Sequence, residues 1–452
     1  MSLLNRAVRP FEVFVERFYP DPFVFAVLLS VLTFGLAIGF TDATPVTAIA
    51  AWGGGLSQLM AFVGQVCLML VVAHALAHTA PVSKALGALA RVPGSATQAY
   101  AIVAAASGLA SLFAWSFGVV GGAIIARRVA IEAARKGIAV HYPLLVASAY
   151  SGFAIWHMGY SASAPLFVAT PGHILEDAIG VIPVTQTILA GWNIATAAVA
   201  LGTIAIICPL MHPRKNIIQV SAEILEASER EENDAPQTPA STPAEHIERA
   251  RVITLTIGAA LFAYLIWWFA TYGLRLDLNI VNWTLLGLCC LFVRSPVHLV
   301  KLIGNSSALV GPVLLQFPLY AGIMGLISQT GLASIIADNF AALATPRTLT
   351  FFAFLSGGLI NVFVPSGGGQ WVIQGPIFIE AAQSLGVDPA RIVMGVAYGD
   401  QWTNLIQPFW AIPILAIAGL RVRDVLGYCF IVLIALFFVF AGALFLIGPG
   451  SV

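Results

Sequence analysis

Long apolar runs without charge constrain this chain more than any other feature. Phe23 to Phe40 contains no charged residue, and further runs cover Val252 to Ala270, Leu278 to Val293 and Val425 to Ile447. A helix needs about 20 apolar residues to cross a hydrocarbon core about 30 Å thick, whereas a membrane β-barrel would show short alternating segments. Only 9% of the 452 residues are charged, against about a quarter in soluble domains. The sequence therefore predicts an all-α polytopic membrane protein.

A hydrophilic segment, residues 212–251, divides the chain near its middle. It is rich in Glu, Pro, Ser and Thr, and this composition predicts a mobile linker. Short matches recur on its two sides in the same order and at nearly constant spacing. Thr44-Pro45-Val46 corresponds to Ser295-Pro296-Val297, and Ala149-Tyr150 to Ala397-Tyr398. A duplicated unit is therefore predicted.

The distribution of Lys and Arg orients the predicted spans, because cytoplasmic loops carry an excess of both. Basic residues before the first span place the N-terminus inside. Residues 98–131 are flanked by basic residues at both ends, which a re-entrant hairpin on the cytoplasmic side explains. An extra helix precedes the second half, so that half runs upside down and its hairpin, residues 348–380, enters from outside. About nine spans and two hairpins result, the pattern of inverted-repeat transporters.

These patterns predict five segments. They are a cytoplasmic N-terminal lead-in at 1–22, the first inverted repeat at 23–211, a hydrophilic cytoplasmic linker at 212–251, a linking transmembrane helix at 252–270, and the second inverted repeat at 278–447. Each repeat is expected to contain a re-entrant helical hairpin and a broken transmembrane helix.

Glycines in the second hairpin predict an anion site. The stretch NVFVPSGGGQWVIQGP, Asn361 to Pro376, cannot face lipid and must be buried or line a cavity. Its backbone N–H groups, a helix N-terminus and a serine hydroxyl could hold a carboxylate, although a plain glycine turn is the alternative. The candidate substrate-binding residues are Ser366, Gly367, Gly368, Gly369 and Gln370. The first hairpin adds Ser116 and Gly118, where close helix packing is the alternative.

The span YGDQWTNLIQPFWAIP, Tyr398 to Pro413, is interrupted by polar residues and prolines. Pro408 removes a backbone hydrogen bond and Asp400 is costly in lipid, so both predict a discontinuous helix beside a cavity. Asp400 could bind a proton or contribute to a sodium site; alternatively, it is solvated at the outer interface or caps a half-helix. The candidates are Asn404 and Gln407 for substrate, and Asn361, Asp400 and Asn404 for the coupling ion.

The matching span of the first half is Ser151 to Gly172, where Ser161 and Ser163 are further substrate-binding candidates. His157 lies there too, but a single histidine among apolar residues is more often a structural hydrogen-bonding residue. No histidine partner is expected for Asp400. His74 and His78 lie one helical turn apart without an accompanying Glu or Cys. The sequence therefore predicts no metal site and no cofactor.

The chemistry of these candidates indicates the class of ligand. No basic residue lies deep in either broken helix, so a single negative charge is favoured over two or three. Four aromatic residues offer apolar surface for a short alkyl tail, or simply pack the core: Trp371, Trp402, Phe409 and Trp410. A zero net charge gives no reason to expect nucleic acid. An anion channel, a carrier of another organic anion such as a dicarboxylate, and an intramembrane enzyme remain alternatives, of which the enzyme has the least support.

Long strings of this sequence resemble the short-chain fatty acid transporters of the AtoE type. The resemblance covers nearly the whole chain, including FYPDPFVFAVLLSVLTF, LINVFVPSGGGQWVIQGP and AYGDQWTNLIQPFWAIP. A member of that family has glutamate where this chain has Asp400. The resemblance implies uptake of short monocarboxylates, such as butyrate or acetoacetate, across a bacterial inner membrane. The residues themselves allow coupling to H+, which suits Asp400, or to Na+, which suits Asn361 and Asn404 equally well. It also implies the ion-transporter superfamily fold, a homodimer and elevator-type movement. Because Ser366 and Asp400 have no evident partner histidine in the sequence, no enzymatic activity is expected.

Overall fold

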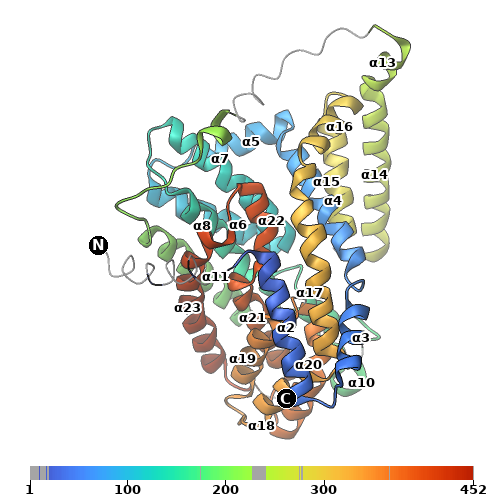
Figure 1. The fold of residues 1–452 in the computed structure, drawn as a ribbon, viewed down its shortest axis with the longest axis vertical. Coiled ribbons are helices and arrows are strands. Elements are labelled where there is room, and N and C mark those ends of the chain that lie inside the picture. Colours follow the sequence, from blue (N-terminus) through green and yellow to red (C-terminus); the bar gives the residue numbers. More distant parts are fainter. Residues whose placement is uncertain are drawn as a thin grey trace.

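A computed structural model describes residues 10, 17, 20–173, 175–226, 241–273, 275, 278–365 and 367–450. These residues form helices and connecting segments, and no strand occurs among them (Figure 1). Seven of the described helices are long and apolar enough to cross a membrane. The predicted all-α membrane fold is thereby confirmed. Most of the lead-in at 1–22, and residues 227–240 of the linker, lie outside the described residues.

The helices before the linker are α2 (Pro22–Phe40), α3 (Pro45–Gly55), α4 (Met60–Ala77), α5 (Ala80–Ala90), α6 (Ala96–Phe113), α7 (Gly122–Arg135), α8 (Tyr142–Gly152), α9 (Ser163–Val168), α10 (Glu176–Ile179) and α11 (Gly191–Leu210). The linker leads into α13 (Pro243–Glu248) and α14 (Arg251–Tyr272). The remaining helices are α15 (Leu278–Phe292), α16 (Pro296–Asn305), α17 (Gly311–Gln329), α18 (Leu332–Ala342), α19 (Leu349–Asn361), α20 (Gly367–Leu385), α21 (Pro389–Thr403), α22 (Pro408–Ala418) and α23 (Val422–Ile447).

The same order of elements occurs in both halves, and the second copy is inverted. Helices α3, α4 and α5 correspond to α16, α17 and α18, and the hairpin α6–α7 corresponds to α19–α20. The matching sequences Thr44-Pro45 and Ser295-Pro296 both cap and start a helix, with the hydroxyl accepting a backbone N–H and proline at the first position. In Figure 1, α5 and α16 lie at the upper end, whereas α18 and α3 lie at the lower end. Corresponding elements therefore point in opposite directions.

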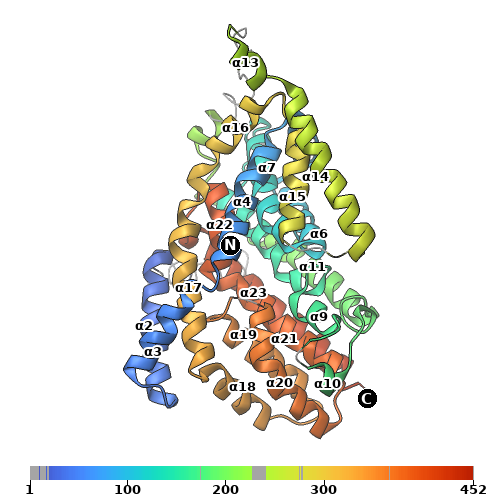
Figure 2. The same cartoon turned by 90° about the vertical axis from the view of Figure 1, so that its right-hand side faces the viewer.

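The helices pack in two groups. The scaffold bundle consists of α2–α4 and α14–α17, with α17 packed against α2 and α3, and α15 against α4. Helix α14 has no counterpart in the other half and lies on the outside against α15 (Figure 2). The hairpin bundle consists of α6–α9, α11 and α19–α23, including both hairpins and both broken spans. The candidate residues lie mainly in this second bundle.

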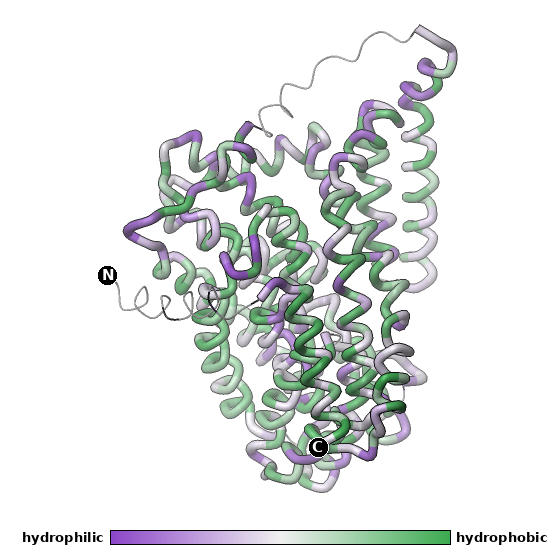
Figure 3. The backbone as a smooth tube through the Cα atoms, in the orientation of Figure 1, coloured by the Kyte–Doolittle hydropathy of each residue, from purple (hydrophilic) through white to green (hydrophobic). Residues whose placement is uncertain are grey.

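The outer surface suits a lipid environment. Leu28, Val31 and Ile266 are large apolar residues that are mostly exposed on α2 and α14. Figure 3 shows hydrophilic residues gathered at the upper end, around α7 and α13, and mostly apolar helices below them. Exposed apolar area on this scale is rare on soluble monomers, and it covers the part of the molecule where the long helices lie.

Candidate functional site

Both broken spans unwind at positions that the sequence dictates. Helix α8 continues as a 3₁₀ turn over Phe153–Met158 and stops at Gly159, where an added Cβ would lie 2.0 Å from the Leu112 carbonyl oxygen. Only glycine lets the chain approach the first hairpin so closely. Helix α21 continues as a 3₁₀ turn over Asn404–Ile406, and Pro408 then begins α22. Each break leaves backbone groups outside a regular helix, buried within the protein.

A cavity of about 220 Å³ lies at the first break, between the two bundles. Three serine hydroxyls line it: Ser116 from the first hairpin, and Ser161 and Ser163 from the break. Its apolar wall consists of Ala114, Trp115, Ala162, Leu166, Leu278 and Val281. The structure thus brings together three serines that were predicted from two separate sequence motifs as substrate-binding candidates.

The hydroxyls differ in what they already bind. The backbone N–H of Trp115 donates to Ser161 Oγ over 2.8 Å, which ties the hairpin tip to the break. Ser116 Oγ is buried and has no hydrogen-bond partner within the described part of the chain. Buried polar atoms without a partner are uncommon and often mark functional sites. Ser116 Oγ therefore has unused hydrogen-bonding capacity beside the cavity.

Ser163 connects this cavity to a buried histidine–aspartate pair. Ser163 Oγ lies 3.2 Å from His157 Nε2, and His157 Nδ1 lies 2.8 Å from Asp400 Oδ2. The Ala164 backbone N–H donates to His157 Nε2 over 3.1 Å, so Nε2 is an acceptor and Nδ1 carries the hydrogen that Asp400 accepts. The histidine is neutral in this arrangement. Its side chain is 0% exposed and that of Asp400 is 2% exposed.

This pair corrects two expectations from the sequence. The expectation that Asp400 has no histidine partner is wrong, because His157 from the other repeat contacts it. The alternative of a solvated Asp400 at the outer interface is also wrong, because the residue is 1% exposed within α21. A signal was present: each broken span contains a single histidine or acidic residue, and an inverted repeat brings the two breaks together.

The three residues nominated for ion coupling also lie together. Asn361 Nδ2, at the end of α19, donates to the Asp400 carbonyl oxygen over 2.8 Å, to Thr403 Oγ1 over 3.0 Å and to Asn404 Oδ1 over 2.7 Å. Gln407 Nε2 donates to the Asn361 carbonyl oxygen. Gln407 thus belongs to the same network, which holds the second hairpin against the second break.

The glycines of the second hairpin lie at the start of α20. Gly367 packs against the pair, since an added Cβ would lie 2.3 Å from His157 Cε1 and 2.6 Å from Ser163 Oγ. Gly368 faces Ser163 at a comfortable distance, Gly369 follows it in the first turn, and Ser366 lies outside the described residues. The positive end of the α20 dipole therefore lies beside the Asp400–His157 pair, where it stabilises negative charge.

Other nominated residues have packing roles in this structure. Gly118 lies against Ser111 within the first hairpin, and its carbonyl oxygen accepts from Ser107 Oγ. Gln370 Nε2 donates to the Gly357 carbonyl oxygen within the second hairpin. Trp402 Nε1 donates to the Leu433 carbonyl oxygen on α23. None of these three residues lines the 220 Å³ cavity.

Two tyrosines missed by the sequence analysis brace the breaks across the repeats. The Tyr150 hydroxyl, on α8, donates to the carbonyl oxygen of Asn404 in the second break. The Tyr398 hydroxyl, on α21, donates to Asn193 Oδ1 over 2.7 Å, and Asn193 Nδ2 donates to the Met158 carbonyl oxygen of the first break over 3.0 Å. Tyr150 and Tyr398 occupy matching positions of the duplicated sequence, so their shared role could have been inferred from that match.

The order serine, histidine, aspartate also occurs in serine hydrolases. Here His157 Nε2, the atom that would take the serine proton, already accepts the Ala164 backbone N–H. That bond weakens His157 as a base for Ser163 and leaves a chain of exchangeable protons between the cavity and Asp400. No cluster of three or more His, Cys, Asp or Glu that could hold a metal ion occurs among the described residues.

Comparison with known proteins places this architecture in a family. The family model described as "Short chain fatty acid transporter" matches residues 3–447. A protein of Escherichia coli K12 named "Putative short-chain fatty acid transporter" is 39% identical over 447 residues, covering 99% of both chains. A Haemophilus influenzae protein of the same name is 36% identical over 453 residues, again covering 99% of both.

Solved structures resemble the chain more distantly. The Alcanivorax borkumensis YdaH transporter aligns with a TM-score of 0.44 at 16% identity, covering 96% of this chain and all of that one. Neisseria gonorrhoeae MtrF aligns with a TM-score of 0.40 at 17% identity, covering 98% of this chain and all of that one. With a family match over nearly its whole length and relatives above 35% identity, the chain belongs to the short-chain fatty acid transporter family.

Proposed function

We propose that this protein is a secondary active transporter that moves short-chain fatty acids, such as butyrate or acetoacetate, across a bacterial inner membrane. The observation that carries the proposal is the 220 Å³ cavity of three hydroxyls and an apolar wall, next to a buried His157–Asp400 pair. We place the N-terminus and the linker on the cytoplasmic side, following the charge distribution.

The lining of the cavity supports a small monocarboxylate as the substrate. The hydroxyls of Ser116 and Ser161 are suited to donate to one carboxylate, and Trp115 and Val281 offer contact to a short alkyl tail. The Ser163 hydroxyl lies 3.2 Å from the acceptor His157 Nε2 and links the cavity to the imidazole. No Lys or Arg is found among the described residues that line it. A dicarboxylate would bury its second charge against the apolar wall, which is costly without a partner.

Protons are the coupling ion that the geometry favours. A buried carboxylate beside a neutral imidazole leaves a net negative charge that the α20 dipole offsets only in part, and such a charge is unfavourable at low dielectric. A proton that enters from the cavity at Ser163 and passes through His157 to Asp400 would cancel it, since consecutive contacts of 3.2 Å and 2.8 Å link these groups.

Sodium is the second candidate. Three oxygens converge near Asn361, but the Asn361 side-chain amide already donates to all of them. A sodium ion there would have to displace this amide, so the proton has the stronger support.

Alternating access by an elevator-type movement fits the position of the cavity. Leu278 and Val281 of the scaffold bundle form one wall, and the hairpin and the break form the others. Sliding the hairpin bundle along the scaffold would expose the cavity to one side at a time. A homodimer joined through the scaffold bundle would hold the scaffold in place during that movement.

Uptake of labelled butyrate into proteoliposomes tests the proposal. We expect saturable accumulation under an inward proton gradient and much less under a sodium gradient, with no accumulation of labelled succinate. Protein-free liposomes are the control, because protonated short-chain acids cross bilayers unaided. Non-saturable flux that follows only the butyrate gradient would indicate a channel, and succinate accumulation would refute the substrate assignment.

A further inference from the structure

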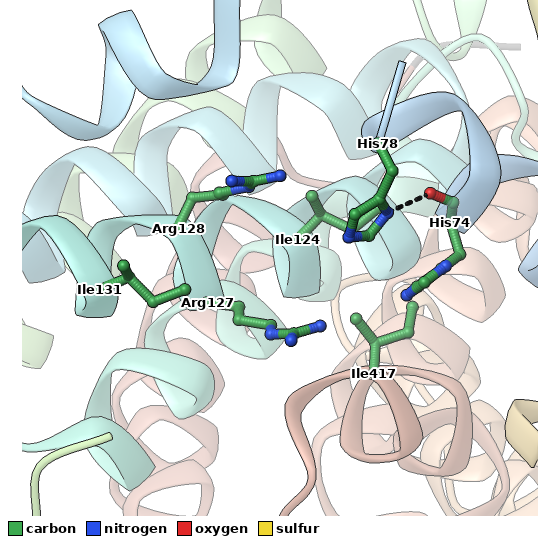
Figure 4. Close-up of a pocket in the computed structure, with 7 residues that line it drawn as sticks. All are labelled: His74, His78, Ile124, Arg127, Arg128, Ile131 and Ile417. Atoms are coloured by element: carbon green, nitrogen blue, oxygen red, sulfur yellow. Dashed lines mark hydrogen bonds between the residues drawn. The ribbon is translucent and has the colours of Figure 1, made fainter. Parts of the chain in front are cut away.

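Four basic or titratable side chains meet at a second place in the molecule, between the two bundles. His74 and His78 of α4 face Arg127 and Arg128 of α7 across a pocket completed by Ile124, Ile131 and Ile417. Figure 4 shows both guanidinium groups pointing toward the histidine side. The pocket encloses only about 10 Å³, room for about one water molecule. It is therefore closed in this conformation.

The charges around this pocket favour an anion. Within the described part of the chain, no Asp or Glu lines it. The nearest acidic residue along α7, Glu132, pairs with Arg135 instead. Arg127 is half-buried and makes no hydrogen bond or ion pair with the residues that the structure describes. A guanidinium presents several N–H donors in one rigid plane, and their spacing matches the oxygens of a carboxylate or phosphate. Partial burial strengthens such charge-assisted hydrogen bonds.

The His78 ring is held in a defined orientation beside His74. His78 Nδ1 lies 2.7 Å from the His74 carbonyl oxygen, which can only accept, so Nδ1 carries the hydrogen. The two rings lie 4.3 Å apart between centroids. If both imidazoles carried a proton, they would repel each other at this distance. An anion bound in the pocket would reduce that repulsion.

The pocket lies at the end of a row of cavities that starts at the candidate substrate site. Ser116 lines both the 220 Å³ cavity and a neighbouring apolar cavity of about 230 Å³. Ile124 lines that apolar cavity and also the His/Arg pocket. All three spaces border the first hairpin, α6–α7, and the last lies toward the end of the molecule that carries the linker.

We infer that the His/Arg pocket is a second anion site, at which Arg127 binds the carboxylate of the substrate on its way between the central cavity and the linker side. This inference rests on the proposed function for its ligand. Separation of α7 from α4 opens the pocket, and the carboxylate then bridges Arg127 and the histidines. The apolar cavity between the two sites accommodates the alkyl tail.

Transport measured separately from the two membrane faces tests the inference. In oriented vesicles, Arg127→Gln raises the KM for butyrate presented on the linker side about tenfold, as expected for one charge-assisted contact, and leaves the KM on the opposite side unchanged. Arg127→Lys restores part of the linker-side affinity. Arg135→Gln is the matched control, since that residue lies on the same helix but pairs with Glu132. Equal KM values for Arg127→Gln and wild type on the linker side would overturn the inference.

A binding measurement keeps this test independent of transport. Butyrate should protect Arg127, but not Arg135, from modification by phenylglyoxal in the purified wild-type protein, as read by peptide mass spectrometry. Protection by inorganic phosphate as well would define a general oxyanion site, and protection by monocarboxylates alone would define a substrate site. Absence of protection by either anion would overturn the inference. If butyrate protects Arg127 but is not transported, the proposed function fails and the anion site stands.

Discussion

At the scale of single residues, the contact between Gly367 and His157 constrains the site most tightly. The first residue of α20 leaves no room for a Cβ, which would lie 2.3 Å from the imidazole and 2.6 Å from Ser163 Oγ. The imidazole cannot move away easily, because Asp400 and the Ala164 N–H hold its two nitrogens. The neighbouring Gly368 meets its nearest atom only at 3.7 Å.

Gly367→Ala should therefore abolish butyrate uptake, whereas Gly368→Ala should leave it close to wild type. Overpacking of this kind typically costs about 1–3 kcal/mol, so the Gly367 variant should also unfold at a lower temperature in detergent. Uptake assays and thermal unfolding of the two variants in parallel provide the measurement. Equal behaviour of the two alanine variants would show that the tip of the second hairpin does not press on His157.

The sequence predicted the residues that the second repeat contributes to this site better than it predicted His157 from the first repeat. Asn361, Asp400 and Asn404 could be grouped because unpaired polar residues in apolar spans must converge on a cavity, and the structure brings them together. A single histidine among apolar residues favours a structural role for His157. Its partner Asp400 is 243 residues away, and only the relative placement of the two repeats reveals the contact. Pairing across repeats is a property of tertiary packing, which local composition does not specify.

At the scale of elements, the two broken spans support each other. Tyr150 of the first span holds the unwound backbone of the second, and Tyr398 of the second holds that of the first through Asn193. An unwound segment in a low-dielectric surrounding needs such donors, because its carbonyl groups have lost their helical partners. The sequence predicted the two breaks but not the hydroxyls that satisfy them.

Tyr150→Phe and Tyr398→Phe should each lower the free energy of unfolding by about 1–3 kcal/mol, the cost of leaving a buried polar group without its partner. Tyr264→Phe is the control, because Tyr264 is 39% exposed on α14. Thermal unfolding in detergent gives the comparison. If the Tyr150 and Tyr398 variants were as stable as the control, these hydrogen bonds would not contribute to holding the breaks.

A second contact between elements attaches the start of the linker. His141 Nδ1, between α7 and α8, accepts the Ile218 backbone N–H over 3.0 Å, and Tyr428 of α23 lies 3.0 Å from Nε2. Burial, followed by the nearby His212, lowers the pKa of His141 to about 4. The folded protein therefore keeps this imidazole neutral, whereas the unfolded chain binds a proton near pH 6.5.

The contribution of His141 to the free energy of unfolding should therefore be complete above about pH 6.5 and decrease as the pH drops toward 4. In that window only the unfolded state gains a proton at this residue. The expected loss is on the order of 3 kcal/mol. Unfolding temperatures measured between pH 7.5 and 4.5 should decline less steeply in His141→Asn than in wild type. His246→Gln, at an exposed position on α13, should keep the wild-type slope; identical slopes for all three proteins would contradict the assignment.

At the scale of the whole molecule, elevator-type alternating access requires the hairpin bundle to move along the scaffold bundle. The two bundles meet at an aromatic contact, where the rings of Phe317 on α17 and Phe409 on α22 stack with centroids 4.0 Å apart. A covalent link at this position would fix the two bundles relative to each other. The rings of Phe34 and Trp52, both within the scaffold bundle, lie 6.3 Å apart and provide a matched pair.

A variant with cysteines in place of Phe317 and Phe409, and without the five natural cysteines, should take up butyrate until a short bifunctional thiol reagent links the two new thiols. Uptake should then stop, and a cleavable reagent should restore it on reduction. The same treatment of a Phe34 and Trp52 cysteine pair should leave uptake unchanged. Undiminished transport by the fully linked Phe317 and Phe409 pair would exclude relative movement of the two bundles at this contact.

The role of the buried His157–Asp400 pair in coupling can be measured by separating accumulation from exchange in Asp400→Asn. Proteoliposomes with an inward proton gradient report accumulation of labelled butyrate, and preloaded proteoliposomes without a gradient report exchange of labelled for unlabelled butyrate. If Asp400 is where the coupling proton binds, the variant should lose accumulation by about tenfold or more while it retains exchange. Accumulation at the wild-type level in Asp400→Asn would contradict the proposal that the buried His157–Asp400 pair couples proton movement to transport.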